Sequence, residues 1–465
     1  MQGCKIVMMR TDHVRGARIH AARAFTRQGW RSNVRLSVEA GRIARVQCDV
    51  APEAGDDRQA IVLPALANVH SHAFQRGMAG LTERRGPSAD DFWSWREVMY
   101  RFALSMNPEQ VEAVACQVYV EMLEAGFCRV GEFHYLHHDL DGRPYQDLGE
   151  MAGRIAAAAE LTGIGLTLLP VFYAHASFGG VAPRENQRRF INTVDSYSRL
   201  LERCRAAVAA LDTAVVGVAP HSLRAVTPAQ LAAVTGMARG APIHIHIAEQ
   251  VKEVEDCIAW SGRRPVQWLL ENAEIDGRWC LVHATHVDAA EKASMIRSGA
   301  VAGLCPITEA NLGDGIFDAA GFLGCGGRFG IGSDSNVQVG VADELRLLEY
   351  SQRLLNRARN VLGDAEFSTG RVLLQGALQG GGAAVGTAAA DLAVGAPADF
   401  VSLDAYHPAL VCRDGDAIVD AWLFSAGNAA VDCVWVGGEK VVEQGRHVRR
   451  DEIRARFIAT MQALG

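Results

Sequence analysis

The central part of this 465-residue chain alternates short apolar runs, rich in β-branched residues, with longer segments of helical periodicity. Between residues 162 and 334 this alternation predicts βα units that build a parallel sheet. Strands are predicted at 164–172, 214–219, 242–247, 280–282, 300–304 and 329–332, and helices at 185–211, 228–238, 264–272 and 289–298. Two earlier apolar runs, 61–69 and 128–133, lie on either side of a helix predicted at 108–125.

Eight predicted strands favour an α/β fold, a closed (β/α)8 barrel of the TIM type. An open doubly wound sheet is the alternative, because strand counts from one sequence are error-prone. A nucleotide-binding sheet of that kind would carry a glycine fingerprint after its first strand, and none occurs. Both ends of the chain instead contain short β segments with glycine turns. We therefore expect residues 63–388 to form the barrel, and residues 1–62 plus 389–465 to form a small β-sandwich domain from both termini.

Composition excludes several classes of protein. The formal charge of −7, the pI near 6.1 and the lack of a long lysine or arginine run argue against nucleic acid as a partner. No stretch is typical of a signal peptide or a membrane span, so we expect a cytoplasmic protein without a membrane partner, with a disordered segment before about Gly16. The eleven cysteines include no CxxC pair and are interpreted mostly as small buried hydrophobic residues.

Histidines are concentrated where predicted strands end. Eleven of the 15 lie between His70 and His286, and the C-terminal strand ends of a barrel form its active-site face. His70 and His72 follow the first apolar run, and in extended backbone both imidazoles can reach one ion. An HxH pair alone is equally compatible with two polar residues at a strand end.

Three further clusters follow in order along the chain. The string HIHIAE places imidazoles at alternate positions of a buried strand, where a metal is one efficient polar partner. Glu249 lies on the same side as His246 only if the strand bends or ends near Ala248. His283 and Asp334 each follow a further short apolar strand. Any one of them is more readily a structural residue, but their joint occurrence at successive strand ends predicts a metal-dependent active site.

The order of these motifs resembles the amidohydrolase superfamily over nearly the whole chain. The segment AVVGVAPHSLRAV has no lysine at its strand end, which is similar to the one-metal deaminases of that superfamily. The longer strings LANVHSHAFQRGMAGL, GEFHYLHH, APHSLRAV, HIHIAEQ and CPITEANLGDGIF resemble the formimidoylglutamate deiminase family. The resemblance implies hydrolysis of N-formimidoyl-L-glutamate to N-formyl-L-glutamate and ammonia, a reaction of histidine degradation.

The resemblance also implies a cofactor and roles for individual residues. One divalent metal ion, expected to be Zn²⁺ from its nitrogen and oxygen donors, would be held by His70, His72, His246 and Asp334. Asp334 would also accept a proton from water, His283 would steady the attacking oxygen, and Glu249 would carry a proton to the leaving nitrogen. A dicarboxylate substrate would be bound by Gln75, Arg96, Tyr135, His221 and Arg224. A homodimer is expected from similar enzymes.

Two alternatives stay open. A related deaminase acting on a purine, pterin or other ring amidine would use the same metal chemistry, but its pocket would need an aromatic floor. The two arginines favour an acidic open-chain substrate, because each guanidinium offers a planar fork of donors to a carboxylate. A non-catalytic assembly protein should lack a ligand or the proton-carrying carboxylate. The histidines of the GEFHYLHH loop, His134, His137 and His138, receive no role and are interpreted as surface residues.

Overall fold

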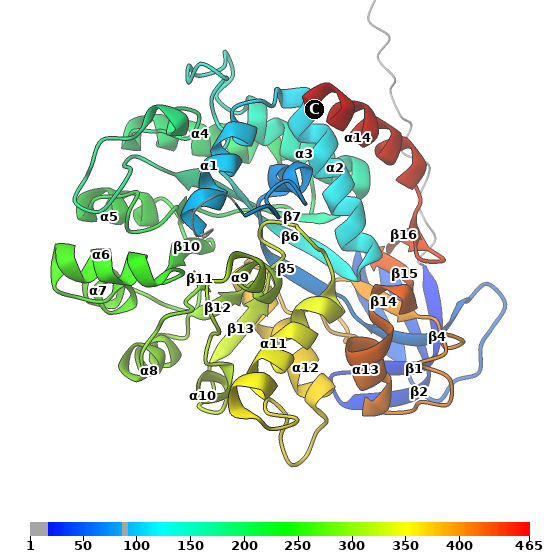
Figure 1. Cartoon of the computed structure of the whole chain (residues 1–465). Coiled ribbons are helices and arrows are strands. Elements are labelled where there is room, and N and C mark those ends of the chain that lie inside the picture. The colour runs from blue at the N-terminus through cyan, green and yellow to red at the C-terminus, as the bar shows by residue number, and fades with distance from the viewer. Residues whose placement is uncertain (1–16, 86–91) are drawn as a thin grey trace, which may run out of the picture.

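Two β-sheets organise the chain, whose computed structural model describes residues 17–85 and 92–465 (Figure 1). The first sheet is a barrel of parallel strands in the order β10-β11-β12-β13-β5-β6-β7-β8, with β9 also paired to β7. Val218, between β8 and β9, bridges Ile243 of β10 and closes the ring. The predicted (β/α)8 barrel is confirmed. Its strands are β5 (Leu66–Ser71), β6 (Phe127–His134), β7 (Gly165–Phe172), β8 (Val215–Val216), β9 (Ala219–Pro220), β10 (Ile243–Ile247), β11 (Trp279–His283), β12 (Val301–Leu304) and β13 (Arg328–Ile331).

The second sheet combines strands from both ends of the chain, as predicted. Its order is β17-β16-β15-β14-β4-β1-β2-β3, so that N-terminal β4 pairs with C-terminal β14. Figure 1 shows these blue and orange strands side by side, next to the barrel. Apolar side chains on one face, among them Leu36, Phe400 and Trp435, form a core of their own. The strands are β1 (Arg18–Thr26), β2 (Gly29–Glu39), β3 (Arg42–Gln47), β4 (Asp57–Pro64), β14 (Phe400–Leu403), β15 (Val431–Val436), β16 (Glu439–Glu443) and β17 (Arg446–His447).

Helices surround the barrel, and several begin at a side-chain cap that the sequence supplies. Asn107 accepts from the backbone of Gln110 and starts the helix α2, whose first residue is a proline. The predicted helices 108–125, 228–238, 264–272 and 289–298 are confirmed within two residues at each end. The α-helices are α1 (Phe92–Ala103), α2 (Pro108–Glu124), α3 (Glu150–Thr162), α4 (Val194–Ala207), α5 (Pro228–Gly236), α6 (Val251–Ser261), α7 (Pro265–Asn272), α8 (Ala289–Ser298), α9 (Pro306–Leu312), α10 (Ala319–Leu323), α11 (Val341–Asn356), α12 (Thr369–Ala384), α13 (Asp416–Ala421) and α14 (Arg450–Leu464). Short 3₁₀ or π segments are η1 (Ala73–Met78), η2 (Glu185–Gln187), η3 (Trp422–Ala426) and η4 (Gly427–Ala430).

Two predicted elements are wrong in their extent. The apolar run 61–69 was predicted as one strand but divides at Ala65 into β4 of the second sheet and β5 of the barrel. Both strands are buried, so a continuous apolar run carries no signal of the change of sheet. The helix predicted at 185–211 is η2 followed by α4, because Thr193 accepts from the backbone of Ser196 and caps a new helix start.

The strand predicted at 214–219 is also interrupted, at Gly217. A methyl group there would lie 2.6 Å from the carbonyl oxygen of Pro242, so the glycine permits a close approach of the backbone of β10. The segment predicted to be disordered before Gly16 lies outside the described residues.

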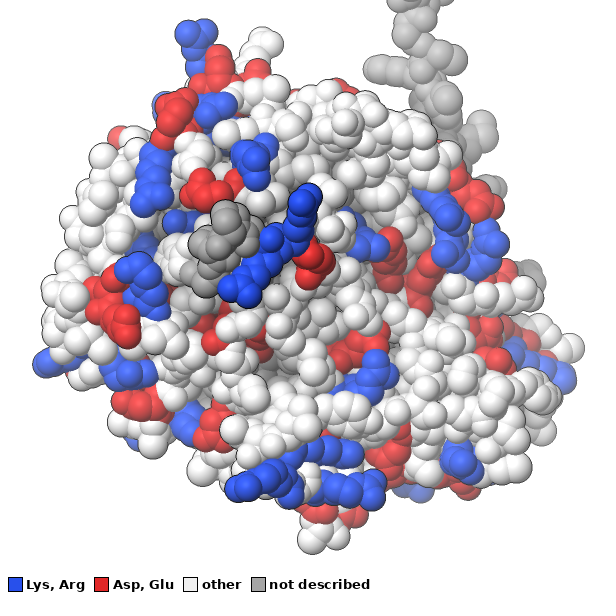
Figure 2. Space-filling model, in the orientation of Figure 1, with Lys and Arg blue, Asp and Glu red and all other residues white. Residues whose placement is uncertain are grey.

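Charged side chains of both signs are interspersed over the face of the molecule in Figure 2. Many form exposed ion pairs, such as Lys252 with Asp256 one helical turn away, and each pair of this kind contributes at most about 1 kcal/mol. Among the described residues, no helix combines the length and apolarity needed to cross a membrane.

Helix α12 packs closely on strand β13, and Gly380→Ala tests this contact. An added methyl group would overlap the carbonyl oxygen of Phe329, so the helix and the strand would have to separate. Overpacking of a core costs about 1–3 kcal/mol. We expect the urea midpoint to fall by an amount equivalent to at least about 1 kcal/mol.

Gly153→Ala in α3 is the matched control for this helix substitution. Its added methyl group meets no heavy atom within 4 Å, so it should stabilise the helix by about 0.5–1 kcal/mol. A similar effect of both substitutions on the urea midpoint would contradict the close packing of α12 on β13.

Candidate metal centre and active site

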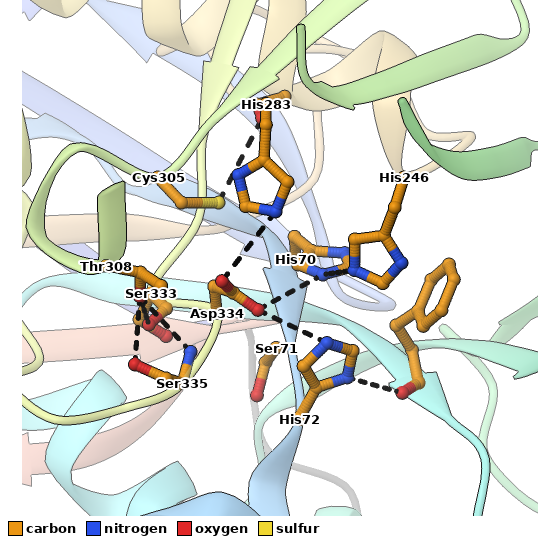
Figure 3. Close-up of polar contacts among 12 residues, drawn as sticks. His70, Ser71, His72, His246, His283, Cys305, Thr308, Ser333, Asp334 and Ser335 are labelled. Carbon is orange, nitrogen blue, oxygen red and sulfur yellow. Dashed lines mark hydrogen bonds and ion pairs between the residues drawn. The ribbon is translucent and has the colours of Figure 1, made fainter. Parts of the chain in front are cut away.

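Four of the predicted active-site side chains meet at the C-terminal end of the barrel. His70 belongs to β5, His72 follows that strand directly, His246 belongs to β10, and Asp334 follows β13. All four are buried. Figure 3 shows their side chains pointing toward one another, with His283 from the end of β11 beside them.

The four candidate ligand atoms lie within 4.8 Å of one another. The Nε2 atoms of His70 and His246 are 3.0 Å apart. Asp334 Oδ1 lies 3.4 Å from His70 Nε2 and 3.2 Å from His72 Nε2. Three imidazole nitrogens and one carboxylate oxygen are therefore gathered around one point.

The protonation of the imidazoles fits a divalent cation at that point. Backbone carbonyls fix two tautomers, because Nδ1–H of His72 donates to Phe133 and Nδ1–H of His246 donates to His221. Burial lowers the pKa of His70 to about 3. His72 and His246 therefore present Nε2 lone pairs to the centre, and Nδ1 of the neutral His70 has no hydrogen-bond partner among the described residues. Nitrogen and carboxylate donors of this kind suit zinc.

The loop after β13 holds Asp334 in place through Asn336. The Asn336 amide donates to the hydroxyl of Ser71 and to the carbonyls of His72 and Asp334, at 3.0 to 3.2 Å. Its own carbonyl accepts from Ser333 at 2.6 Å. Asp334 and Asn336 both have left-handed backbone, with φ of 45° and 55°. Such conformations persist where surrounding hydrogen bonds determine them.

Glu249 lies where the predicted bend brings it. Strand β10 ends at Ile247, and Ala248 has left-handed backbone with φ of 52°, which confirms the break needed to turn Glu249 toward the centre. Its Oε1 is 3.7 Å from Nε2 of His283. Burial raises the pKa of Glu249 to about 7, which suits a group that takes up and releases protons near neutrality.

Three carboxylates surround His283. Its Nε2 lies 3.8 Å from Asp334 Oδ2, and its Nδ1 contacts Glu309 Oε1 at 3.3 Å. Burial alone lowers the pKa of His283, but the charges of Glu249, Glu309 and Asp334 outweigh it and raise the pKa to about 10. Sequence reasoning missed Glu309, which lies inside the string CPITEANLGDGIF. It also missed Cys305, whose thiol lies within 4.8 Å of ligand atoms of His283 and Asp334.

The five residues predicted to bind substrate line a single pocket together with the metal-centre residues His72, His246, Glu249, His283 and Asp334. Gln75 donates to the hydroxyl of Tyr135 at 2.8 Å, and the His221 ring lies tilted against that of His246, with ring centroids 4.9 Å apart. The guanidinium groups of Arg96 and Arg224 lie 4.4 and 5.6 Å from the Trp93 ring. The buried Nε atoms of both arginines have no hydrogen-bond partner among the described residues.

Seven further lining residues were not predicted, and all but Tyr173, which follows β7, come from helices or loops away from the strand ends. They are apolar or aromatic, which is the composition of an ordinary helix face or core. The set comprises Phe92, Trp95, Met99, Tyr100, Tyr173, Phe190 and Leu312.

The histidines of the GEFHYLHH loop are buried, so their interpretation as surface residues is wrong. His137 and His138 use Nε2 to bond the carbonyls of Val171 and Ile191, both at 2.8 Å. Burial lowers the pKa of His134 to about 3. These neutral side chains fasten the loop after β6, and none belongs to a metal-ligand group of the described residues. His244, the other imidazole of β10, likewise bonds a carbonyl, that of Ala384, at 2.7 Å.

Comparison with known proteins defines the class. The family model described as the amidohydrolase family matches residues 61–441, and this chain belongs to that family. A second model, described as the N-terminal domain of the formimidoylglutamate deiminase HutF, matches residues 17–60.

Two related proteins and one solved structure are similar to this chain over most of its length. The chain is 53% identical to formimidoylglutamate deiminase of Pseudomonas aeruginosa, over 96% of this chain and 99% of that protein. It is 27% identical to 5-methylthioadenosine/S-adenosylhomocysteine deaminase of Natronomonas pharaonis, over 90% of each protein. The crystal structure of an amidohydrolase from Brucella melitensis superimposes with a TM-score of 0.94 at 58% identity, covering 96% of this chain and 99% of that one.

Asn336→Ala tests the support of the metal-binding loop. The substitution leaves the buried groups that Asn336 satisfies without a partner, at about 1–3 kcal/mol, and it places alanine in left-handed backbone, at about 1–2 kcal/mol. We expect the apparent free energy of unfolding to fall by at least about 2 kcal/mol in urea denaturation.

Asn360→Ala separates the two contributions. Asn360 has φ of 53° but is exposed, and its side chain accepts only from Arg353. The control should therefore lose about 1 kcal/mol, the backbone cost alone. Equal losses in the two variants would show that the buried hydrogen bonds of Asn336 do not support the loop.

Proposed function

We propose that this protein is a hydrolase that converts N-formimidoyl-L-glutamate and water into N-formyl-L-glutamate and ammonia, a step of histidine degradation. The observation that carries the proposal is one pocket lined by three members of the metal-ligand group, His72, His246 and Asp334, and by the two arginines Arg96 and Arg224. The identity of 53% to formimidoylglutamate deiminase of Pseudomonas aeruginosa over almost the full length of both proteins supports the same substrate. Location in the cytoplasm and assembly as a homodimer belong to the proposal on the strength of the family resemblance.

The proposed cofactor is one Zn²⁺ ion held by His70, His72, His246 and Asp334. Bound there, the ion would lower the pKa of water to about 7 and so supply hydroxide at neutral pH. The imidazole tautomers are set for this purpose, because Phe133 and His221 carbonyls keep the Nδ1 protons of His72 and His246 directed away from the centre.

Three side chains would handle the protons of the reaction. Asp334 Oδ2, on the side of His283, accepts a proton from the attacking water. His283 Nε2–H donates to the oxygen that adds to the formimidoyl carbon and steadies its developing charge. Glu249, 3.7 Å from His283, delivers a proton to the nitrogen as its bond to carbon breaks, so that ammonia leaves instead of an amide anion.

Charge selects an acidic, open-chain substrate over a ring amidine. Arg96 and Arg224 offer planar donor groups that match two carboxylates, and Gln75 and Tyr135 add neutral hydrogen-bonding groups. The pocket does contain aromatic rings, but one of them, Tyr100, lies 5.5 Å from the Arg96 guanidinium, and Trp93 lies 4.4 Å from the same group. These rings hold the guanidinium group in place by cation–π contacts. A carboxylate substrate needs such a fixed cation, whereas an uncharged ring amidine does not.

The substrate proposal is tested by ammonia release. Freshly purified protein, with bound metals measured on the same sample, should contain about one zinc per chain and release ammonia from N-formimidoyl-L-glutamate. A purine nucleoside with a ring amidine serves as the comparison and should release at least 100-fold less at equal concentration. Ammonia release from the nucleoside alone, or a metal-free active enzyme, would overturn the proposal.

Glu249→Gln tests the proton carrier. The amide keeps the shape of the side chain but cannot transfer the proton, and general acid–base catalysis contributes about 10²–10⁴-fold. We expect kcat to fall by at least about 100-fold while bound zinc stays near one per chain. Full activity in this variant would remove Glu249 from the mechanism, and loss of zinc would make it a support of His246 instead.

A further inference from the structure

Two tyrosine hydroxyls in the pocket are fastened by one buried amide. Tyr100 lies on α1 and Tyr173 follows β7, and both line the pocket. Gln187, on η2 and only 1% exposed, donates through Nε2 to both hydroxyls, at 3.2 Å to Tyr100 and 2.8 Å to Tyr173. The tyrosines therefore meet at a fixed point although they come from separate segments.

At least one of the two tyrosine hydroxyls has no hydrogen-bond acceptor among the described residues. Both protons of the Gln187 amide are used, so each tyrosine oxygen accepts one hydrogen bond. The pair has two hydroxyl protons, and a bond from one hydroxyl to the other would use only one of them. At least one O–H of the pair therefore has no acceptor among the described residues. A buried donor without a partner is costly, and a ligand that accepts hydrogen bonds would satisfy it.

The charge around this donor points to an anion as the missing acceptor. The Arg96 guanidinium lies 5.5 Å from the Tyr100 ring. Burial raises the pKa of the Tyr173 hydroxyl, against the charges of Arg224 and Arg96, which both act to lower it. Arg224 has no described carboxylate in contact and lies buried in the pocket wall. Two guanidinium groups and a hydroxyl donor together match the oxygens of a carboxylate.

Tyr173 lies one layer farther from the metal centre than Tyr135 and His221. Tyr135 and His221 contact the ligand rings directly, with centroids 5.0 Å from His72 and 4.9 Å from His246. Tyr173 contacts the next layer, with its ring 4.6 Å from His221. In N-formimidoyl-L-glutamate the side-chain carboxylate is the one farther from the reacting carbon, so the outer layer suits that group.

We propose that Tyr100 and Tyr173, positioned by Gln187, bind the side-chain carboxylate of the substrate and so select a glutamate side chain. The inference rests on the proposed function and deepens it. Gln187 acts through the tyrosines and is a positioning residue. Its loop is tied to the end of α1 by the buried Arg189, which donates to the carbonyls of Ala103 and Met106 at 2.6 and 2.9 Å. The hydrogen bonds of Arg189 therefore keep Tyr100 and Gln187 close to each other.

Tyr173→Phe and Tyr100→Phe test the proposal with two substrates. N-Formimidoyl-L-norvaline has the same side-chain length as the glutamate derivative but a methyl group in place of the carboxylate. A hydrogen bond to a charged group is equivalent to about 10- to 100-fold in binding. We expect KM for N-formimidoyl-L-glutamate to rise by that factor in at least one variant, with kcat within about threefold. Kinetics on the norvaline derivative should stay unchanged.

Gln187→Leu and Tyr406→Phe complete the experiment. Gln187→Leu should raise KM for the glutamate derivative without affecting the norvaline derivative, which a general loss of folding could not do. Tyr406 is 89% exposed, and its replacement should change neither substrate. Equal effects on both substrates, or no effect of either tyrosine variant, would overturn the inference. If the unmodified enzyme released no ammonia from N-formimidoyl-L-glutamate, the proposed function itself would fail instead.

Discussion

The contact between the Nε2 atoms of His70 and His246, 3.0 Å apart, is the constraint on which the site depends. Both imidazoles are neutral because they are buried. The His221 carbonyl holds the proton of His246 at Nδ1, so its Nε2 turns a lone pair toward His70 and the centre. A divalent cation at this point would bind both nitrogens. The carbonyls that fix the tautomers belong to β6 and to the segment after β9, so neighbouring barrel strands determine the electronic state of the ligands.

The backbone around this contact is held in conformations that single residues rarely adopt. Ala248, His283, Ala284, Asp334 and Asn336 all have positive φ, and each lies at or just after the end of a barrel strand. Their cost is of the order of 1–3 kcal/mol each, which the barrel's hydrogen bonds and packed helices offset. At Ala248 the result is geometric, because the turn brings Glu249 into the pocket, whereas regular strand alternation would direct it to the opposite side from His246.

Much of this site was predictable from the sequence because its central residues follow apolar strands. An apolar run in the sequence marks a buried strand, and the end of the run marks the end of the strand. His70, His246 and Asp334 could therefore be placed on one face of a barrel without a structure. The change of sheet at Ala65 was not predictable, since buried strands of two sheets have the same apolar composition. Gln187 and Glu309 carry no local pattern either. Their roles depend on tertiary contacts with Tyr173 and His283, which no spacing in the sequence encodes.

Catalysis and selection are therefore carried by different parts of the chain. The metal-ligand group rests on rigid strands, where small displacements would change the distances between donors. The cations and hydroxyls that would bind the substrate come from α1 and from the segments after β6, β7 and β9. Buried hydrogen bonds of the loop containing Gln187 hold α1 and the segment after β7 together. A family with one metal chemistry can acquire new substrates by altering such segments while the strand ends stay the same. In the proposed function, the arginines and tyrosines of those segments would favour a dicarboxylate, and the selectivity would follow from charge placed at a distance from the reacting bond.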